Sequence, residues 1–199
     1  MNAIRTKPLR ERSLFGVFLT LRAIPAGAVA IAITFSANHA IIVGQISFVA
    51  FGLVSAPVLL LTSVASGFPR NLRLLFLLEA VVTLLSAAFM AVTVGSGLNE
   101  SSDALRIFTL TVGVWAAISC LAEFLSSRFS ARSDESREML LVAVLLALLA
   151  LSQLLLPLND VFAVGLFGAF AAILCVLTAI AGFTLITSTN PRPQKAEQA

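Results

Sequence analysis

The sequence predicts an all-α polytopic membrane protein, with six transmembrane helices arranged as three antiparallel hairpins. Of its 199 residues, 59% are apolar and only 12% are charged, whereas charged residues make up about a quarter of a typical soluble domain. The apolar residues form six runs, each close to the ~20 residues that a helix needs to cross a bilayer. The runs are continuous rather than alternating, which argues against a transmembrane β-barrel.

Polar breaks separate the six runs and set the expected helices. We expect spans at residues 15–36, 41–62, 74–94, 105–125, 139–156 and 161–186. The breaks after the first and fifth spans hold only about four residues, so the helices that flank them must be antiparallel neighbours. A basic tail (residues 1–13) precedes the membrane domain (14–186), and a polar tail (187–199) follows it. Neither tail can bury an apolar face, so we expect both to be unstructured.

Basic residues alternate from one break to the next. Twelve of the 13 lysines and arginines fall on the side of the two chain ends, and only Arg106 falls on the other side. Basic residues beside membrane spans stay in the cytoplasm, which predicts that both termini are cytoplasmic. Their position beside the spans favours attraction to anionic lipids of the inner leaflet. It does not favour nucleic acid, because no basic stripe with interleaved aromatic residues is present.

The start of the chain also resembles the outline of a secretory signal peptide. Arg22 and Pro25 interrupt its apolar run and no clear cleavage site follows, so we interpret it as a retained first helix. Each hairpin opens with an arginine, namely Arg22, Arg73 and Arg137. This spacing favours a weak internal triplication. The alternative, that any hairpin begins with a basic anchor at the inner face, stays open.

Besides Arg106 at the outer edge of the fourth span, three charged residues lie inside the expected spans: Arg22, Glu79 and Glu123. Ionisable residues are costly in a bilayer and point to function by default. At about 1.5 Å per residue, all three lie within about 10 Å of the cytoplasmic ends of their helices. An Arg22–Glu79 pair is therefore allowed geometrically. The alternatives are separate snorkelling to the interface and a proton or ion path, against which stands the lack of an acidic residue at the midplane of any span.

His39, the only histidine, lies in the first outer loop. Because histidine titrates near pH 6.5, His39 is a candidate pH sensor, with an ordinary exposed loop residue as the alternative. A lone histidine with no nearby cysteine does not form a metal site. Cys120 and Cys175 both lie within apolar runs, so we expect no disulfide.

The sequence lacks every common catalytic signature. It contains no phosphate-binding loop, nucleophile elbow, zinc-protease motif, C-x-x-C pair or dinucleotide fingerprint. With one histidine, no tyrosine and no clustered carboxylates, general acid–base catalysis lacks its residues. We therefore predict no enzyme, no catalytic residue, no metal and no cofactor.

Two further patterns have functional alternatives. Polar residues on the second, third and fourth spans favour a common cleft, as in a small transporter or channel: Gln45, Ser47, Thr83, Ser86, Thr109, Thr111 and Ser119. Small residues recur at four-residue spacing and allow close approach of helices: Ala26 with Ala30, Ala28 with Ala32, Gly113 with Ala117, Gly165 with Ala169, and Gly168 with Ala172. We interpret these as internal packing faces, with the seam of a homo-oligomer as the alternative.

The layout resembles the HdeD-like family of bacterial membrane proteins. The resemblance covers residues 18–185 and is carried by the hairpin arrangement and by the opening RAIPAG (22–27). Pro157 at the end of the fifth span also fits the family pattern, as do four spaced glycines: Gly44, Gly52, Gly165 and Gly168. The chain departs from the family pattern at Leu78, where the first hairpin has Gly27, and in the first outer turn, which lacks a proline.

This resemblance implies a small, non-enzymatic protein of the bacterial inner membrane that supports acid or envelope-stress tolerance through membrane-protein partners. It implies no catalytic residues. A small transporter or channel, and an assembly or anchoring subunit of a membrane complex, stay open as alternatives.

Overall fold

The computed structural model describes residues 3–36, 40–65, 68–97, 103–130, 133–156 and 159–187. Over these residues the chain forms six α-helices and no β-strand. The helices are α1 (Ala3–Thr34), α2 (Ile41–Val64), α3 (Arg70–Gly95), α4 (Ala104–Phe129), α5 (Ser133–Leu155) and α6 (Asp160–Thr187).

Each helix contains a stretch of 21 to 28 residues that is long and apolar enough to cross a membrane. Large apolar side chains also cover the outside of the bundle; Val92 and Phe183, for example, are each 68% exposed. Such a surface is stable in lipid and aggregates in water. The predicted fold class, a six-span helical membrane protein, is confirmed.

Two segments outside the expected spans are helical. The expectation of an unstructured tail is wrong for residues 3–13, because α1 begins at Ala3. The alanine, arginine, leucine and glutamate of this segment favour helix, so the helix continues beyond the apolar run. The polar segment 126–138, between the fourth and fifth expected spans, is mostly helical as well: α4 continues to Phe129 and α5 begins at Ser133. There the Ser136 hydroxyl donates to the Ser127 carbonyl at 2.8 Å and holds the turn.

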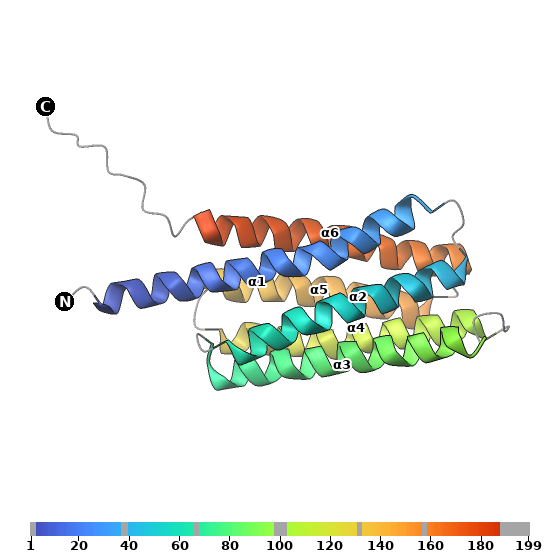
Figure 1. Ribbon diagram of the computed structural model, residues 1–199, viewed down its shortest axis with the longest axis horizontal. Coiled ribbons are helices and arrows are strands. Elements are labelled where there is room, and N and C mark those ends of the chain that lie inside the picture. Colours follow the sequence, from blue (N-terminus) through green and yellow to red (C-terminus); the bar gives the residue numbers. More distant parts are fainter. Residues whose placement is uncertain are drawn as a thin grey trace, which may run out of the picture.

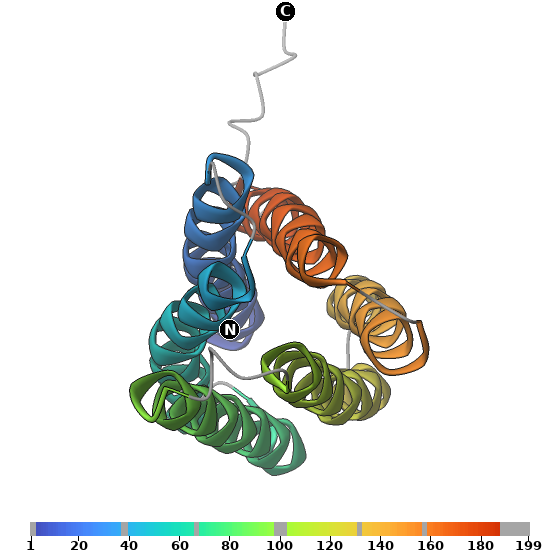
Figure 2. The same ribbon diagram turned by 90° about the vertical axis from the view of Figure 1, so that its right-hand side faces the viewer.

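The six helices form a closed ring in the order α1, α2, α3, α4, α5, α6 (Figures 1 and 2). We call the end of the bundle that holds the chain termini the terminal end, and the opposite end the distal end (Figure 1). Helix ends at the terminal end are Val64, Arg70, Phe129, Ser133 and Thr187. Helix ends at the distal end are Thr34, Ile41, Gly95, Ala104, Leu155 and Asp160.

The helix pairs that are joined or meet at the terminal end have the most extensive contact. Helix α2 packs against α3, α4 packs against α5, and α1 closes the ring against α6. The pairs joined at the distal end, α1–α2, α3–α4 and α5–α6, are antiparallel neighbours with less contact. Helices α2, α4 and α6 also contact one another across the interior.

Two apolar clusters fill the interior. In the first, aromatic rings from α2, α4 and α6 meet at centroid separations of 5.4 to 6.4 Å: Phe48, Phe51, Phe108, Trp115, Phe167 and Phe170. We call these six residues the aromatic layer. The second lies nearer the terminal end and includes Phe15, Leu19, Phe68, Leu72, Phe76, Met139 and Leu185. We call these seven residues the terminal cluster. The charged residues of the spans lie between the two.

Candidate functional site

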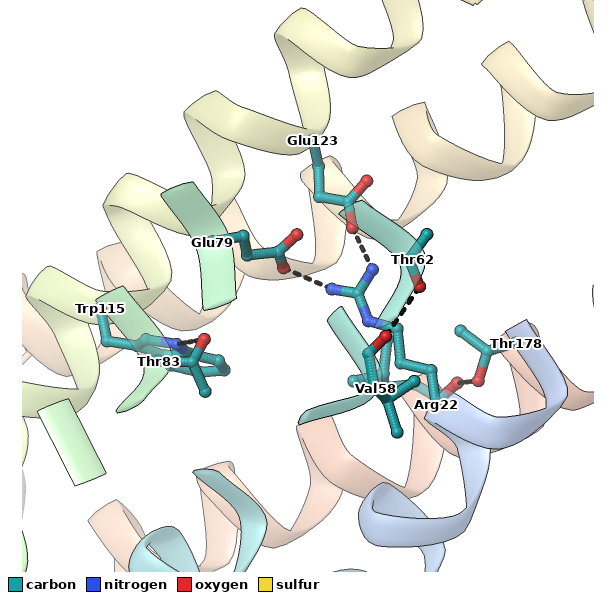
Figure 3. A network of polar contacts seen from close by, with 9 residues as sticks. Arg22, Val58, Thr62, Glu79, Thr83, Trp115, Glu123 and Thr178 are labelled. Carbon is teal, nitrogen blue, oxygen red and sulfur yellow. Dashed lines mark hydrogen bonds and ion pairs between the residues drawn. The ribbon is translucent and has the colours of Figure 1, made fainter. Parts of the chain in front are cut away.

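Arg22 on α1 binds two glutamates from two other helices. Its Nη2 donates to Glu79 Oε1 on α3 at 2.5 Å, and its Nη1 donates to Glu123 Oε1 on α4. The side chains are 11%, 2% and 2% exposed, respectively. Figure 3 shows the arginine reaching from its own helix across the interior to both carboxylates. We call this group the charge triad.

Helix geometry places the three residues at one level. Arg22 is eight residues from Leu14, where the apolar part of α1 begins, or about 12 Å at the helical rise. Glu79 is nine residues from the terminal end of α3, and Glu123 is six residues from that of α4, or about 14 Å and 9 Å. An arginine side chain is long enough to span the remaining difference. The structure thus brings together the three charged residues, Arg22, Glu79 and Glu123, that the sequence analysis singles out inside the spans.

The charges of the triad do not cancel. A guanidinium group is planar, always protonated, and able to present separate N–H groups to two acceptors. Here one cation serves two carboxylates, each of which accepts through a single oxygen. With both carboxylates ionised, the site carries one net negative charge, and an uncompensated charge in a bilayer interior costs several kcal/mol. One additional positive charge would make the site neutral.

Hydroxyl groups near the triad differ in whether they have partners. Thr62 and Thr178 lie beside it (Figure 3) and donate to carbonyls of their own helices, at 2.8 Å and 2.7 Å. Ser55 on α2 and Ser119 on α4 are 2% and 0% exposed, and their hydroxyls have no protein partner. Nearer the distal end, both amide atoms of the fully buried Gln45 also lack a partner.

One hydrogen bond joins α3 and α4 above the triad on the distal side. The indole nitrogen of Trp115 donates to Thr83 Oγ1 at 3.0 Å (Figure 3). Trp115 is eight residues before Glu123 and Thr83 is four residues after Glu79, so each shares a helix face with its glutamate. Both residues are buried.

The seven polar residues expected to form a common cleft do not lie in one cleft. Gln45, Ser47, Thr83 and Ser119 are buried in the bundle. Ser86 and Thr111 line an outward-facing groove of about 370 Å³ between α3 and α4, with Leu85, Phe89, Leu110 and Val114. The Thr109 hydroxyl donates to the carbonyl of Arg106. Sequence spacing groups residues by helix, but not by the face each helix turns inward.

The small-residue pairs divide in the same way. Ala26 and Ala30 are buried, and Gly168 lies against Ile33 of α1, as expected of internal packing. Ala28 and Ala32 are exposed, and Gly165 faces open space. Gly113 lies against Leu154, whereas Ala117 is exposed. Four-residue spacing places two residues near one face of a helix, but it does not show whether that face points inward.

The three arginines that open the hairpins have three different environments. Arg22 binds the two glutamates, Arg73 Nε donates to the Ser63 carbonyl at 2.7 Å, and Arg137 is exposed. The expected triplication therefore repeats no common arginine contact. His39, the candidate pH sensor, lies outside the described residues.

Within the described part of the chain, no group of three or more histidine, cysteine, aspartate or glutamate residues is arranged to hold a metal ion. The two cysteines are free and half-buried. No protein-family model matches this chain, and no match is found among curated proteins or solved structures.

Proposed function

We propose that this chain is a small, non-enzymatic protein of the bacterial inner membrane, of the HdeD-like kind, which supports acid or envelope-stress tolerance through a proton held by its charge triad. The observation that carries the proposal is the binding of one buried arginine by two buried glutamates. The resemblance of the sequence to the HdeD-like family supports the location in a bacterial inner membrane and the link to acid tolerance. The net negative charge of the triad supports the binding of a proton.

The proton is the simplest positive charge that balances the triad. Arg22 compensates one carboxylate, and a proton on the other removes the remaining charge without requiring space for an ion. A falling pH supplies that proton. The protonated carboxyl also gains an O–H donor, which changes the hydrogen bonding between α1, α3 and α4. Acid thus acts on the contact that joins three helices.

The distribution of described basic residues supports an orientation. Arg70, Arg73, Arg128 and Arg137 lie at the terminal end, whereas Asp103 and Asp160 lie at the distal end with Arg106. By the positive-inside rule the terminal end is cytoplasmic. We propose that both termini are cytoplasmic and that the distal end faces the outside.

A deletion strain of the host bacterium tests the proposal. We expect slower growth or survival at low external pH, restored by the wild-type gene but not by Glu79→Gln or Glu123→Gln, which remove one carboxylate and with it the charge that binds the proton. Glu135→Gln is the matched control, because Glu135 is also buried but lies outside the triad. Membrane abundance of each variant is measured by immunoblot.

Normal growth of the deletion strain at low pH and under membrane stress would contradict the proposal. So would full rescue by both glutamine variants.

A small transporter or channel is the second candidate. The observation that favours it is the set of buried polar groups without protein partners, on Gln45, Ser55, Ser119 and Gln153, since such groups ordinarily bind water or a ligand. A saturable flux of a specific solute into liposomes, lost in Glu79→Ala, would support this function. Absence of flux across a panel of solutes and ions would count against it.

A further inference from the structure

We propose that the charge triad exchanges its proton with the distal side of the bundle, through ordered waters held by Ser55, Ser119 and Gln45. This inference rests on the proposed function, because it assigns the side from which the proton enters. Three observations support this inference: the buried polar groups without protein partners, the Trp115–Thr83 hydrogen bond, and the apolar packing of the terminal cluster.

Unpartnered polar groups mark the water positions. The hydroxyls of Ser55 and Ser119 and the amide of Gln45 are at least 98% buried and make no hydrogen bond to protein. A buried polar group without a partner is costly, and native proteins satisfy such groups with ordered water. A water bound at each of these sites would satisfy the group and supply a proton carrier.

Two of the water sites lie at about the level of the carboxylates along the bundle. Ser119 is four residues before Glu123 and so shares its helix face. Ser55 is nine residues from the terminal end of α2 and Ser119 is ten from that of α4, or about 14 Å and 15 Å along their helices. Glu79 lies at a similar level, about 14 Å along α3. Waters on these hydroxyls are therefore placed to bond the carboxylate oxygens that Arg22 does not occupy.

Toward the distal end from these sites, the Trp115–Thr83 hydrogen bond places polar groups at the level of the aromatic layer. Thr83 accepts the indole N–H, and its own hydroxyl hydrogen is available to donate. Trp115 is 11 residues from the distal end of α4, and Gln45 is four residues from that of α2, or about 17 Å and 6 Å deep. Three or four water-to-water steps of about 2.8 Å cover this difference. The proposed route passes beside the Trp115–Thr83 bond.

On the terminal side the rings of the terminal cluster fill the interior, and Glu135, also buried at that end, accepts a hydrogen bond from the Ser130 hydroxyl at 3.3 Å. The Phe68 ring lies 5.8 Å from that of Phe15 and 5.9 Å from that of Phe76, centroid to centroid. The hydroxyls of Thr62, Ser63 and Ser127 donate to carbonyls of their own helices. No unpartnered group there calls for water, among the buried side chains that the structure describes.

Few other charges face the two carboxylates. Arg22 faces them from α1, and the carboxylates of α3 and α4 face each other across its guanidinium (Figure 3). Helix α4 adds the Cys120 thiol, three residues before Glu123. Helix α2, α5 beyond Glu138 and α6 beyond Asp160 contain no charged residue. The proton balance of the site is therefore set by the triad itself.

Trp115 allows the side of proton entry to be measured. It is the only tryptophan in a chain without tyrosine, so its emission reports on the neighbourhood of the triad. The full chain is reconstituted into liposomes with a buffered interior, and the bulk solution is acidified rapidly. Protection of a C-terminal tag from added protease gives the fraction of chains whose distal ends face the bulk.

We expect an immediate change of Trp115 emission in a fraction of chains equal to the protease-protected fraction. The remaining chains should respond only after a protonophore is added. An immediate fraction equal to the cleaved fraction would overturn the proposal, because it places the entry at the terminal end. A response that waits entirely for the protonophore would overturn it too.

Variants test the route itself. Gln45→Leu and Ser119→Ala each remove a water partner, and we expect them to slow the immediate phase about tenfold, the effect of losing one hydrogen-bonded step. Ser152→Ala is the control, since the Ser152 hydroxyl bonds its own helix at Leu149 and lies off the route. Equal rates in Gln45→Leu, Ser119→Ala and wild type would contradict the assigned path.

Thiol labelling decides the case if Trp115 emission does not respond to pH. In a chain with Cys120→Ala and Cys175→Ala, Ser119→Cys should react with a small charged methanethiosulfonate in chains whose distal ends face the bulk. Thr62→Cys, equally buried on the terminal side, should not react. An unreactive Ser119→Cys overturns the proposal, and so does a more reactive Thr62→Cys. Proton entry and acid-limited growth are separate measurements, so either proposal can fail alone.

Discussion

The side chain of Trp115 joins α4 to α3 by donating its indole N–H to Thr83 Oγ1 at 3.0 Å. Its ring also packs edge-to-face against Phe48 and Phe51 of α2, at centroid separations of 5.4 Å and 5.5 Å. One residue thus supplies both a polar contact between neighbouring helices and three ring contacts within the aromatic layer. This combination allows the two contributions to be separated experimentally.

Trp115→Phe should retain much of the ring packing and remove the hydrogen bond. We expect a loss of about 1 kcal/mol in unfolding free energy, the net value of one such bond, measured by denaturation in detergent micelles. Thr83→Val, which removes the acceptor, should cost a similar amount. In the double variant the two losses should not add, because they remove the same bond. Fully additive losses would show that the bond contributes nothing.

Arg22→Gln should be the most destabilising change in the triad. It leaves two buried carboxylates without a cation, and breaking a buried ion pair in this way costs about 3–5 kcal/mol. Arg22→Lys should recover only part of that loss, because an ammonium group does not present the planar fork of a guanidinium. The comparison is made by thermal unfolding of purified variants.

Removing all three charges together should be tolerated far better. The triple variant Arg22→Met, Glu79→Leu and Glu123→Leu leaves no unpaired charge, and apolar replacements of buried ion pairs are often neutral or stabilising. We expect a melting temperature near that of the wild type, with loss of the acid phenotype. A triple variant as unstable as Arg22→Gln would mean that the triad holds the fold together.

Gly182→Ala should weaken the contact between α1 and α6. A Cβ at residue 182 would lie 2.6 Å from the carbonyl oxygen of Gly16 and would also meet the Thr20 hydroxyl. Because backbone cannot yield as a flexible side chain does, the helices must separate, and we expect a loss of about 1–3 kcal/mol. Gly165→Ala is the matched control on the same helix: nothing lies within 4 Å of its Cβ position, so its melting temperature should be unchanged or higher.

Phe68→Ala should open the terminal cluster. The ring packs against Phe15, Phe18 and Phe76 from two helices, and truncating such a phenylalanine costs about 3–5 kcal/mol. Phe183→Ala, at a ring that is 68% exposed on the outside of the bundle, should cost much less in micelles. A Phe68→Ala variant as stable as Phe183→Ala would contradict the assigned role of this cluster.

The sequence predicts the depth of the charge triad in the membrane better than it predicts which polar side chains face the triad. Depth along a span follows from residue counting, so Arg22, Glu79 and Glu123 were expected at one level. The same counting does not show which face of a helix points inward. For this reason the sequence predicts one cleft for Ser86, Thr111, Thr83 and Ser119, although Ser86 and Thr111 line an outward groove. The unpartnered state of Ser55 gave no sequence signal at all, because it depends on what other helices place beside it.

By itself, the sequence determined that the chain has six membrane-spanning helices, because hydropathy and length are properties of each segment alone. The tertiary structure decided that α1 closes against α6, and that Arg22 reaches two glutamates 57 and 101 residues away. Contacts at such separations depend on the rotation of each helix about its axis. In a bilayer that rotation is set by the packing of neighbouring helices, since lipid surrounds every apolar face equally well.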